Sequence, residues 1–195
     1  MQIEKRTQRV IRDIVEHYEE RCRRKNTTEK AIVFFGTRKA AIAAYRALRE
    51  IRPNYFSEEI NEESKVHLIM PQDAKDKKIF LNWKDKKLDF FSLVGNDTWR
   101  EELKANFLKE NSTFRIAIAV GHLIRGFSND LLDTIYLDRS PPETVLRQVI
   151  TRVNGRAKGK TNALIVSYNS TATRALKKLW KEQLQSLSLE KAISQ

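Results

Sequence analysis

The chain has 195 residues, of which 41% are hydrophobic, so it can bury the core of one large domain or two small ones. Its single cysteine, Cys22, excludes a disulfide framework and a cysteine-ligated metal site, and no apolar run approaches the roughly 20 residues of a membrane span. The net charge of +12 favours a polyanionic partner, with nucleic acid first and a membrane surface second. Because the chain opens with charged residues and not with a secretory signal, we expect a cytoplasmic protein.

The N-terminal part of the chain predicts a helix, a strand and a second helix. Apolar residues at helical spacing predict a helix over residues 3–24. The apolar run at residues 31–35 predicts a buried strand, which ends at Gly36. Thr37 is placed to cap a following helix that continues to Pro53. This succession of strand, turn and helix is half of an α/β unit.

Strands and helices alternate through the remainder of the chain. Short apolar runs predict strands over residues 66–70, 114–120, 134–137 and 163–168. Helical patterns cover residues 99–109, 143–153 and 171–189, and a lysine- and aspartate-rich insertion covers residues 73–87. The alternation predicts an α/β fold with a mainly parallel sheet that is covered on both faces. We expect one domain over residues 1–195, with flanking helices at residues 1–25 and 171–189.

Ligands of such a sheet bind at the carboxyl ends of its strands, where we expect four candidate segments. In the first, Gly36, Thr37 and Arg38 offer backbone amides at a helix start, a hydroxyl and a cation, which suits a phosphate group. An ordinary turn with a capping threonine is the alternative. In the second, Gly121 and Gly126 permit close backbone approach to a ligand. His122 between them is either catalytic or hydrogen-bonded locally.

The third segment covers residues 138–142, where Asp138 either pairs with an arginine or caps a turn. The fourth covers residues 148–156. Gln148 and Arg152 are four residues apart and share one helix face, and Arg156 follows where the helix is expected to end. Guanidinium groups at a helix end suit the bidentate binding of a phosphate during its transfer. A surface helix with solvated arginines is the alternative.

Two other kinds of site are not supported by the sequence. Residues 155–161, Gly-Arg-Ala-Lys-Gly-Lys-Thr, are one residue too short for a P-loop and lie between a helix and a strand in the wrong order. The three histidines have no ligand spacing, so we expect no metal site. No nucleophile–base pair or dinucleotide fingerprint supports a small-molecule enzyme.

The candidate segments resemble helicase motifs in their usual order. Residues 30–41 resemble motif IV, residues 125–127 with the strand up to residue 139 resemble motif V, and residues 148–156 resemble motif VI. The sequences of these motifs are most similar to those of the motor subunit of type I restriction enzymes, a superfamily-two DNA translocase. The resemblance covers about residues 30–168. The resemblance implies the second RecA-like domain of the motor, a three-layer domain of the P-loop NTPase type that lacks its own Walker A loop.

The resemblance also implies ligands and partners. ATP and Mg²⁺ would be held mainly by a first RecA-like domain, which carries the Walker motifs. Further partners would be duplex DNA, the nuclease domain of the same subunit, and the methyltransferase and specificity subunits of an ATP-dependent type I site-specific deoxyribonuclease. The residues implied are Gln148 and Gly126 for ATP, Arg152 and Arg156 for catalysis, and Gly36, Thr37, Arg38, Gly121 and His122 for DNA.

Three positions depart from the family pattern. Arg125 and Ser128 stand where motif V has threonine and aspartate, and Gly155 stands where motif VI has its second arginine, so that Arg156 comes one position late. These departures leave a second hypothesis open, a degenerate helicase-like module that docks on DNA or protein without catalysis. Under both hypotheses we expect the chain alone to be inactive as an ATPase, because it lacks the Walker lysine and carboxylates.

Overall fold

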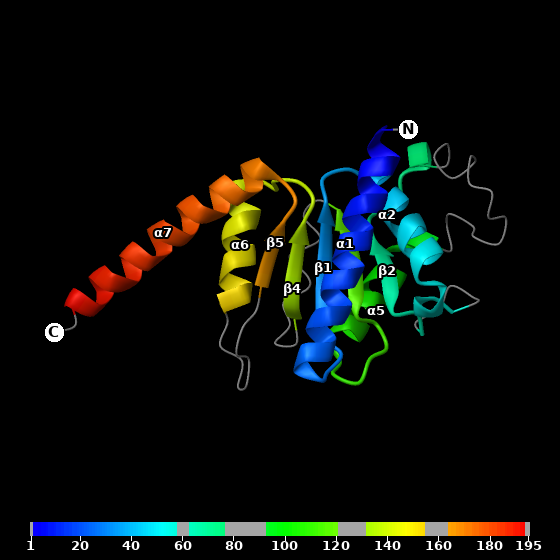
Figure 1. Cartoon of the computed structure of the whole chain (residues 1–195), viewed down its shortest axis with the longest axis horizontal. Coiled ribbons are helices and arrows are strands. Elements are labelled where there is room, and N and C mark those ends of the chain that lie inside the picture. The colour runs from blue at the N-terminus through cyan, green and yellow to red at the C-terminus, as the bar shows by residue number, and fades with distance from the viewer. Residues whose placement is uncertain (1, 58–62, 77–92, 121–131, 155–163, 194–195) are drawn as a thin grey trace.

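Five strands form one parallel sheet (Figure 1), in a computed structural model that describes residues 2–57, 63–76, 93–120, 132–154 and 164–193. The order across the sheet is β2-β3-β1-β4-β5, and all four pairings between neighbours are parallel. The strands are β1 (Lys30–Phe35), β2 (Val66–Ile69), β3 (Ile116–Val120), β4 (Leu132–Leu137) and β5 (Leu164–Ser167). The predicted α/β fold with a parallel sheet is therefore confirmed.

The central strand β1 is buried on both faces, which explains its unbroken apolar sequence. Successive side chains of a strand point to opposite faces. Val33 and Phe35 consequently belong to one hydrophobic cluster, whereas Ile32 and Phe34 belong to the other. Complete burial of each of these large side chains stabilises the fold by about 1.5–3 kcal/mol.

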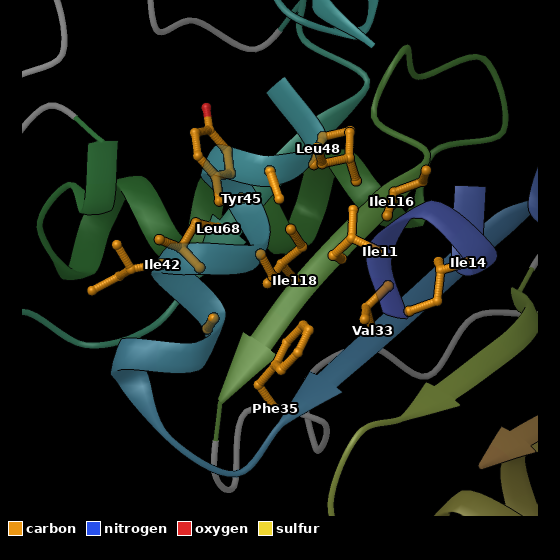
Figure 2. Close-up of a cluster of buried hydrophobic side chains, with 14 of the residues drawn as sticks. Ile11, Ile14, Val33, Phe35, Ile42, Tyr45, Leu48, Leu68, Ile116 and Ile118 are labelled. Atoms are coloured by element: carbon orange, nitrogen blue, oxygen red, sulfur yellow. The ribbon is translucent and has the colours of Figure 1, made fainter. Parts of the chain in front are cut away.

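Helices α1 (Gln2–Lys25) and α2 (Arg38–Ile51) cover one face of the sheet. Figure 2 shows Ile11 and Ile14 of α1 and Leu48 of α2 packed over β1 and β3. Thr37 caps α2, because its hydroxyl oxygen accepts a hydrogen bond from the amide of Ala40 at 3.2 Å. The N-terminal helix, expected to flank the domain, thus contributes to its core.

Helices α5 (Asp97–Leu108), α6 (Glu143–Asn154) and α7 (Ser170–Ile193) lie over the other face. Leu176 and Leu179 in the first part of α7 pack on the body of the molecule, and the far end of the helix extends away from it (Figure 1). Trp180 is accordingly 40% exposed. The two short 3₁₀-helices are η1 (Pro53–Tyr55) and η2 (Ala74–Asp76). No helix in the described part of the chain is both long and apolar enough to span a membrane.

Two buried charged residues lie at the amino-terminal ends of β1 and β4. The ammonium group of Lys30 donates hydrogen bonds to the carbonyl oxygens of Phe107 and, at 2.5 Å, of Lys109, at the end of α5. The carboxylate of Asp133 accepts hydrogen bonds from Arg21 and Lys25 of α1. Each buried charge therefore joins a strand to a helix on a different face of the sheet. Most of the predicted insertion at residues 73–87 lies outside the described residues.

Candidate phosphate-binding sites on two sides of the sheet

The start of α2 forms an exposed, positively charged surface at the carboxyl end of β1. Gly36, Thr37 and Lys39 are exposed, and Arg38 donates a hydrogen bond to the carbonyl oxygen of Pro71, just after β2. The first turn of α2 contains no acidic residue, although a helix start is the place where acidic side chains are stabilising. Two cations at the start of a helix make this turn suitable for a phosphate group. The structure shows Thr37 in the alternative role predicted for it, that of a helix cap. The binding of a phosphate by Gly36, Thr37 and Arg38 stays a prediction.

Arg139, which follows β4, lies against Gly36. A β-carbon at position 36 would be 3.0 Å from Cβ and 3.1 Å from Cγ of Arg139, and closer still to its Cδ. A larger residue at position 36 would therefore force the Arg139 side chain to shift, because that side chain occupies the space of a β-carbon. The sequence analysis did not single out Arg139. The available signal was that β1 and β4 both end in a turn with an arginine, and neighbouring parallel strands end at one edge.

Asp138 forms an ion pair with Arg6 of α1, which confirms one of the two roles predicted for it. The carboxylate is 4% exposed and the arginine 45%. Arg6 also donates to the carbonyl oxygen of Tyr168 at 3.4 Å, and the hydroxyl of Tyr168 donates to Asp13. These contacts fasten the N-terminal half of α1 to the carboxyl ends of β4 and β5. The sequence analysis missed Arg6, because its partner is 132 positions away along the chain.

Helix α6 carries the predicted arginine segment to the opposite edge of the sheet. It begins at Glu143, directly after the carboxyl end of β4, and its 12 residues extend about 18 Å. The chain then enters β5 at Leu164, which pairs with Thr134 near the amino-terminal end of β4. Figure 1 shows α6 returning in this way along the sheet. The expectation that all four segments share the carboxyl edge is therefore wrong for Arg152, because a parallel crossover must bring the chain back before the next strand.

Gln148 lies on α6, one turn before Arg152. Its side-chain oxygen Oε1 is buried and accepts no hydrogen bond within the described part of the structure. The neighbouring Arg147 is instead fully engaged on the surface, with Glu143 at 2.7 Å and Glu182 at 3.0 Å. A buried amide oxygen without a donor is costly, which makes Gln148 a suitable group for a ligand or a partner domain.

Several predicted residues lie outside the described part of the chain. These are Gly121, His122, Gly126 and Arg156, and the side chain of Arg152 belongs with them. Their roles stay predictions. Among the described residues, no group of three histidine, cysteine or acidic side chains is arranged to hold a metal ion. The binding of the nucleotide and Mg²⁺ expected from the family resemblance stays a prediction as well.

Comparisons with known proteins bear separately on the fold and on the family of this chain. The domain 2 of the DEAD-box helicase Mss116p, solved bound to an RNA duplex, is similar with a TM-score of 0.53 and 16% sequence identity. The similarity covers 91% of this chain and 56% of that chain, so this chain spans little more than half of its length. A comparison of the sequence with curated proteins gave no match.

The structural similarity shows a RecA-like fold of the helicase domain 2 type. It does not show which ligands this chain binds. The family assignment rests on the sequence. The family described as type I restriction enzyme subunit R domain 3 matches residues 7–170, which include the whole sheet and both phosphate-binding candidates. The chain belongs to the family of type I restriction enzyme subunit R domain 3.

Proposed function

We propose that this chain is the second motor domain of an ATP-dependent DNA translocase in a type I restriction-modification system. The observation that carries the proposal is the exposed cationic turn at the start of α2, at the carboxyl edge of a RecA-like sheet in a member of this family. The domain works with a first RecA-like domain, which makes most of the contacts to ATP and Mg²⁺. Nuclease, methyltransferase and specificity functions belong to other parts of the assembly.

DNA binds at the carboxyl edge through its phosphates. The backbone amides of Gly36 and Thr37 and the cations of Arg38 and Lys39 supply the contacts. Gly121 and His122, which follow β3 in the sequence, are proposed as further DNA contacts. Contacts of this kind fix the position of the duplex but do not read its sequence. Binding is therefore strongly dependent on salt and nearly independent of the DNA sequence.

ATP is contacted from the other end of α6. Gln148 binds the nucleotide together with Gly126, while Arg152 and Arg156 stabilise the negative charge that develops on the transferred phosphoryl group. Because α6 spans the height of the sheet, the DNA contacts and the ATP contacts lie at opposite edges of the domain. The first motor domain consequently approaches the amino-terminal edge, and DNA crosses the carboxyl edge of the second domain.

Complementation with a first motor domain tests the proposal. The 195-residue chain is mixed with the first RecA-like domain of a subunit of this family, and DNA-stimulated ATP hydrolysis is measured. We expect neither domain alone to turn over ATP and the mixture, or a fusion of the two, to do so. Motor-like hydrolysis by this chain alone would contradict the proposal.

The departures at Ser128 and Gly155 favour one other function, that of a docking module without catalysis. Such a module binds DNA or a partner protein but adds nothing to the ATPase activity of a first domain. In the complementation experiment it gives DNA binding without any stimulation of hydrolysis. Ser128→Asp restores only one of the two family residues and leaves Gly155 in place, so turnover should stay absent in that case.

A further inference from the structure

Three cations form a stripe along the N-terminal half of α1. Lys5, Arg9 and Arg12 follow the spacing i, i+4, i+7, so they lie on one face of the helix. All three are exposed, while Val10, Ile11 and Ile14 on the other side of the helix are buried in the core. The stripe therefore faces away from the sheet and spans about 10 Å along the helix axis.

The three cations differ from the other basic residues of α1 in having no acidic partner among the described residues. Arg6 pairs with Asp138, and Arg21 and Lys25 pair with Asp133. The last basic residues pair with a glutamate within the helix: Arg23 and Arg24 both contact Glu20. Lys5, Arg9 and Arg12 thus contribute neither to packing nor to an ion pair in the described structure.

Helix stability does not account for the stripe either. Cations near the start of a helix are unfavourable, because the aligned peptide dipoles place partial positive charge there. The same outward face turns acidic further along, with Glu16 and Glu20. The cations of α1 that have no acidic partner in the described structure are therefore concentrated in its N-terminal half, and a polyanion is the ligand that this arrangement suits.

The stripe lies at the edge of the sheet at which DNA is proposed to bind. Arg6, next to Lys5 in the sequence, contacts Asp138 and Tyr168 at the carboxyl ends of β4 and β5. Figure 1 shows the N-terminus of α1 near the same edge as the start of α2. The cations of α1 thus continue the surface formed by Arg38 and Lys39.

We propose that Lys5, Arg9 and Arg12 bind the phosphates of duplex DNA and extend the contact surface at the start of α2 across α1. The proposal rests on the proposed function, because it takes DNA as the ligand of the carboxyl edge. Phosphates follow one another every 3.4 Å or so along each strand, so a stripe of this length reaches about three of them. The contacts are electrostatic and independent of sequence.

The test compares two triple variants with the same loss of charge. One carries Lys5→Gln, Arg9→Gln and Arg12→Gln. The control carries Arg174→Gln, Lys177→Gln and Lys181→Gln, which remove three exposed cations at spacing i, i+3, i+7 from α7. The affinity for a 20-base-pair duplex is measured by fluorescence anisotropy at several salt concentrations, and circular dichroism checks that each variant is folded.

We expect the α1 variant to bind about 10- to 50-fold more weakly at 0.1 M salt, with the slope of log affinity against log salt reduced by about 2–3. The α7 control should lose no more than about threefold. A third variant, Arg9→Lys with Arg12→Lys, keeps the charge and should retain wild-type affinity within about twofold.

Four outcomes would overturn the inference. Equal losses in the α1 and α7 variants would mean that net charge alone matters. If the wild type binds DNA and the α1 variant binds it equally well, the three cations do not contact DNA, and the proposed function is unaffected. Loss of assembly with other subunits at unchanged DNA affinity would assign the stripe to an acidic protein surface. Absence of DNA binding by the wild-type chain would contradict the proposed function as well.

Discussion

Arg139 packs against the backbone of Gly36, so that the turns after β4 and β1 touch at the carboxyl edge of the sheet. The two strands are neighbours, and their ends are brought together by their parallel pairing. The glycine leaves room for the arginine side chain, which lies against the exposed turn that precedes α2. The effects of substitutions at the two positions on stability should therefore be coupled.

Gly36→Ala should destabilise the domain by about 1–2 kcal/mol, because the added methyl group meets the Arg139 side chain. The same change in an Arg139→Ala background should cost about 1 kcal/mol less, since most of the obstructing atoms are gone. Urea unfolding of the wild type, both single variants and the double variant measures this coupling. Additive effects of the two changes would show that the side chains do not meet in solution.

Asp133 links α1 to the sheet and should make stability sensitive to acid. Burial raises the pKa of its carboxyl group, but hydrogen bonds from Arg21, Lys25 and Thr134 outweigh burial and hold the pKa below its usual value. Asp133→Asn should therefore cost about 3 kcal/mol at pH 7, because it leaves the partly buried Arg21 without its anion.

The stabilisation by the ionised carboxylate of Asp133 should be lost at acidic pH. The unfolded chain binds the proton of Asp133 more readily than the folded chain, so the stabilisation is present above pH 4 or so and is lost as the pH falls further. The stability difference between wild type and Asp133→Asn should shrink accordingly between pH 5 and pH 3. Glu20→Gln is the control, since it removes an exposed carboxylate of the same helix and should leave the unfolding midpoint nearly unchanged.

Lys30 should also make stability rise with pH, but at alkaline pH. Burial and the nearby charge of Arg115 lower the pKa of Lys30 to about 8. The unfolded chain keeps this proton up to about pH 10.4, so deprotonation of the folded chain relieves a penalty as the pH rises above 8. Relative to Lys30→Met, the wild type should gain about 1–2 kcal/mol between pH 7.5 and 9.5.

The comparison with Lys30→Met is needed because buried tyrosines act in the other direction. Burial raises the pKa of Tyr45 to about 12, so the unfolded chain loses this proton first and stability falls above pH 10. Both proteins contain Tyr45, and its contribution cancels in their difference. A difference that stays constant from pH 7.5 to 9.5 would mean that Lys30 titrates normally in the folded state.

The fold could be predicted because its strands carry the pattern of a sheet covered on both faces. Residues 31–35 are buried without exception, and only a parallel sheet between two helical layers requires such a run. Thr37 and Pro142 marked the starts of two helices through local chemistry. The strand order, by contrast, depends on contacts between distant segments, such as β1 with β4, that no local pattern encodes.

The candidate site could be predicted only in part, for two physical reasons. The partners of Asp138 and Gly36 are Arg6 and Arg139, and side-chain contacts over such separations are not visible in spacing. The placement of Arg152 at the carboxyl edge was an error of a different kind. A helix that joins two parallel strands must end near the start of the second strand, so the direction of α6 followed from the predicted fold itself.

Arg152→Ala should abolish ATP turnover when this domain is combined with a first motor domain. An arginine that stabilises a phosphoryl transition state contributes about 10³-fold or more to kcat, whereas its loss affects the KM for ATP far less. Arg147→Ala is a matched control on the same helix, because Arg147 is occupied on the surface by Glu143 and Glu182 and lies five positions earlier. It should change kcat by less than about threefold. Steady-state kinetics with saturating DNA separate the two variants, and equal losses of kcat in both would mean that α6 matters to the fold and not to catalysis.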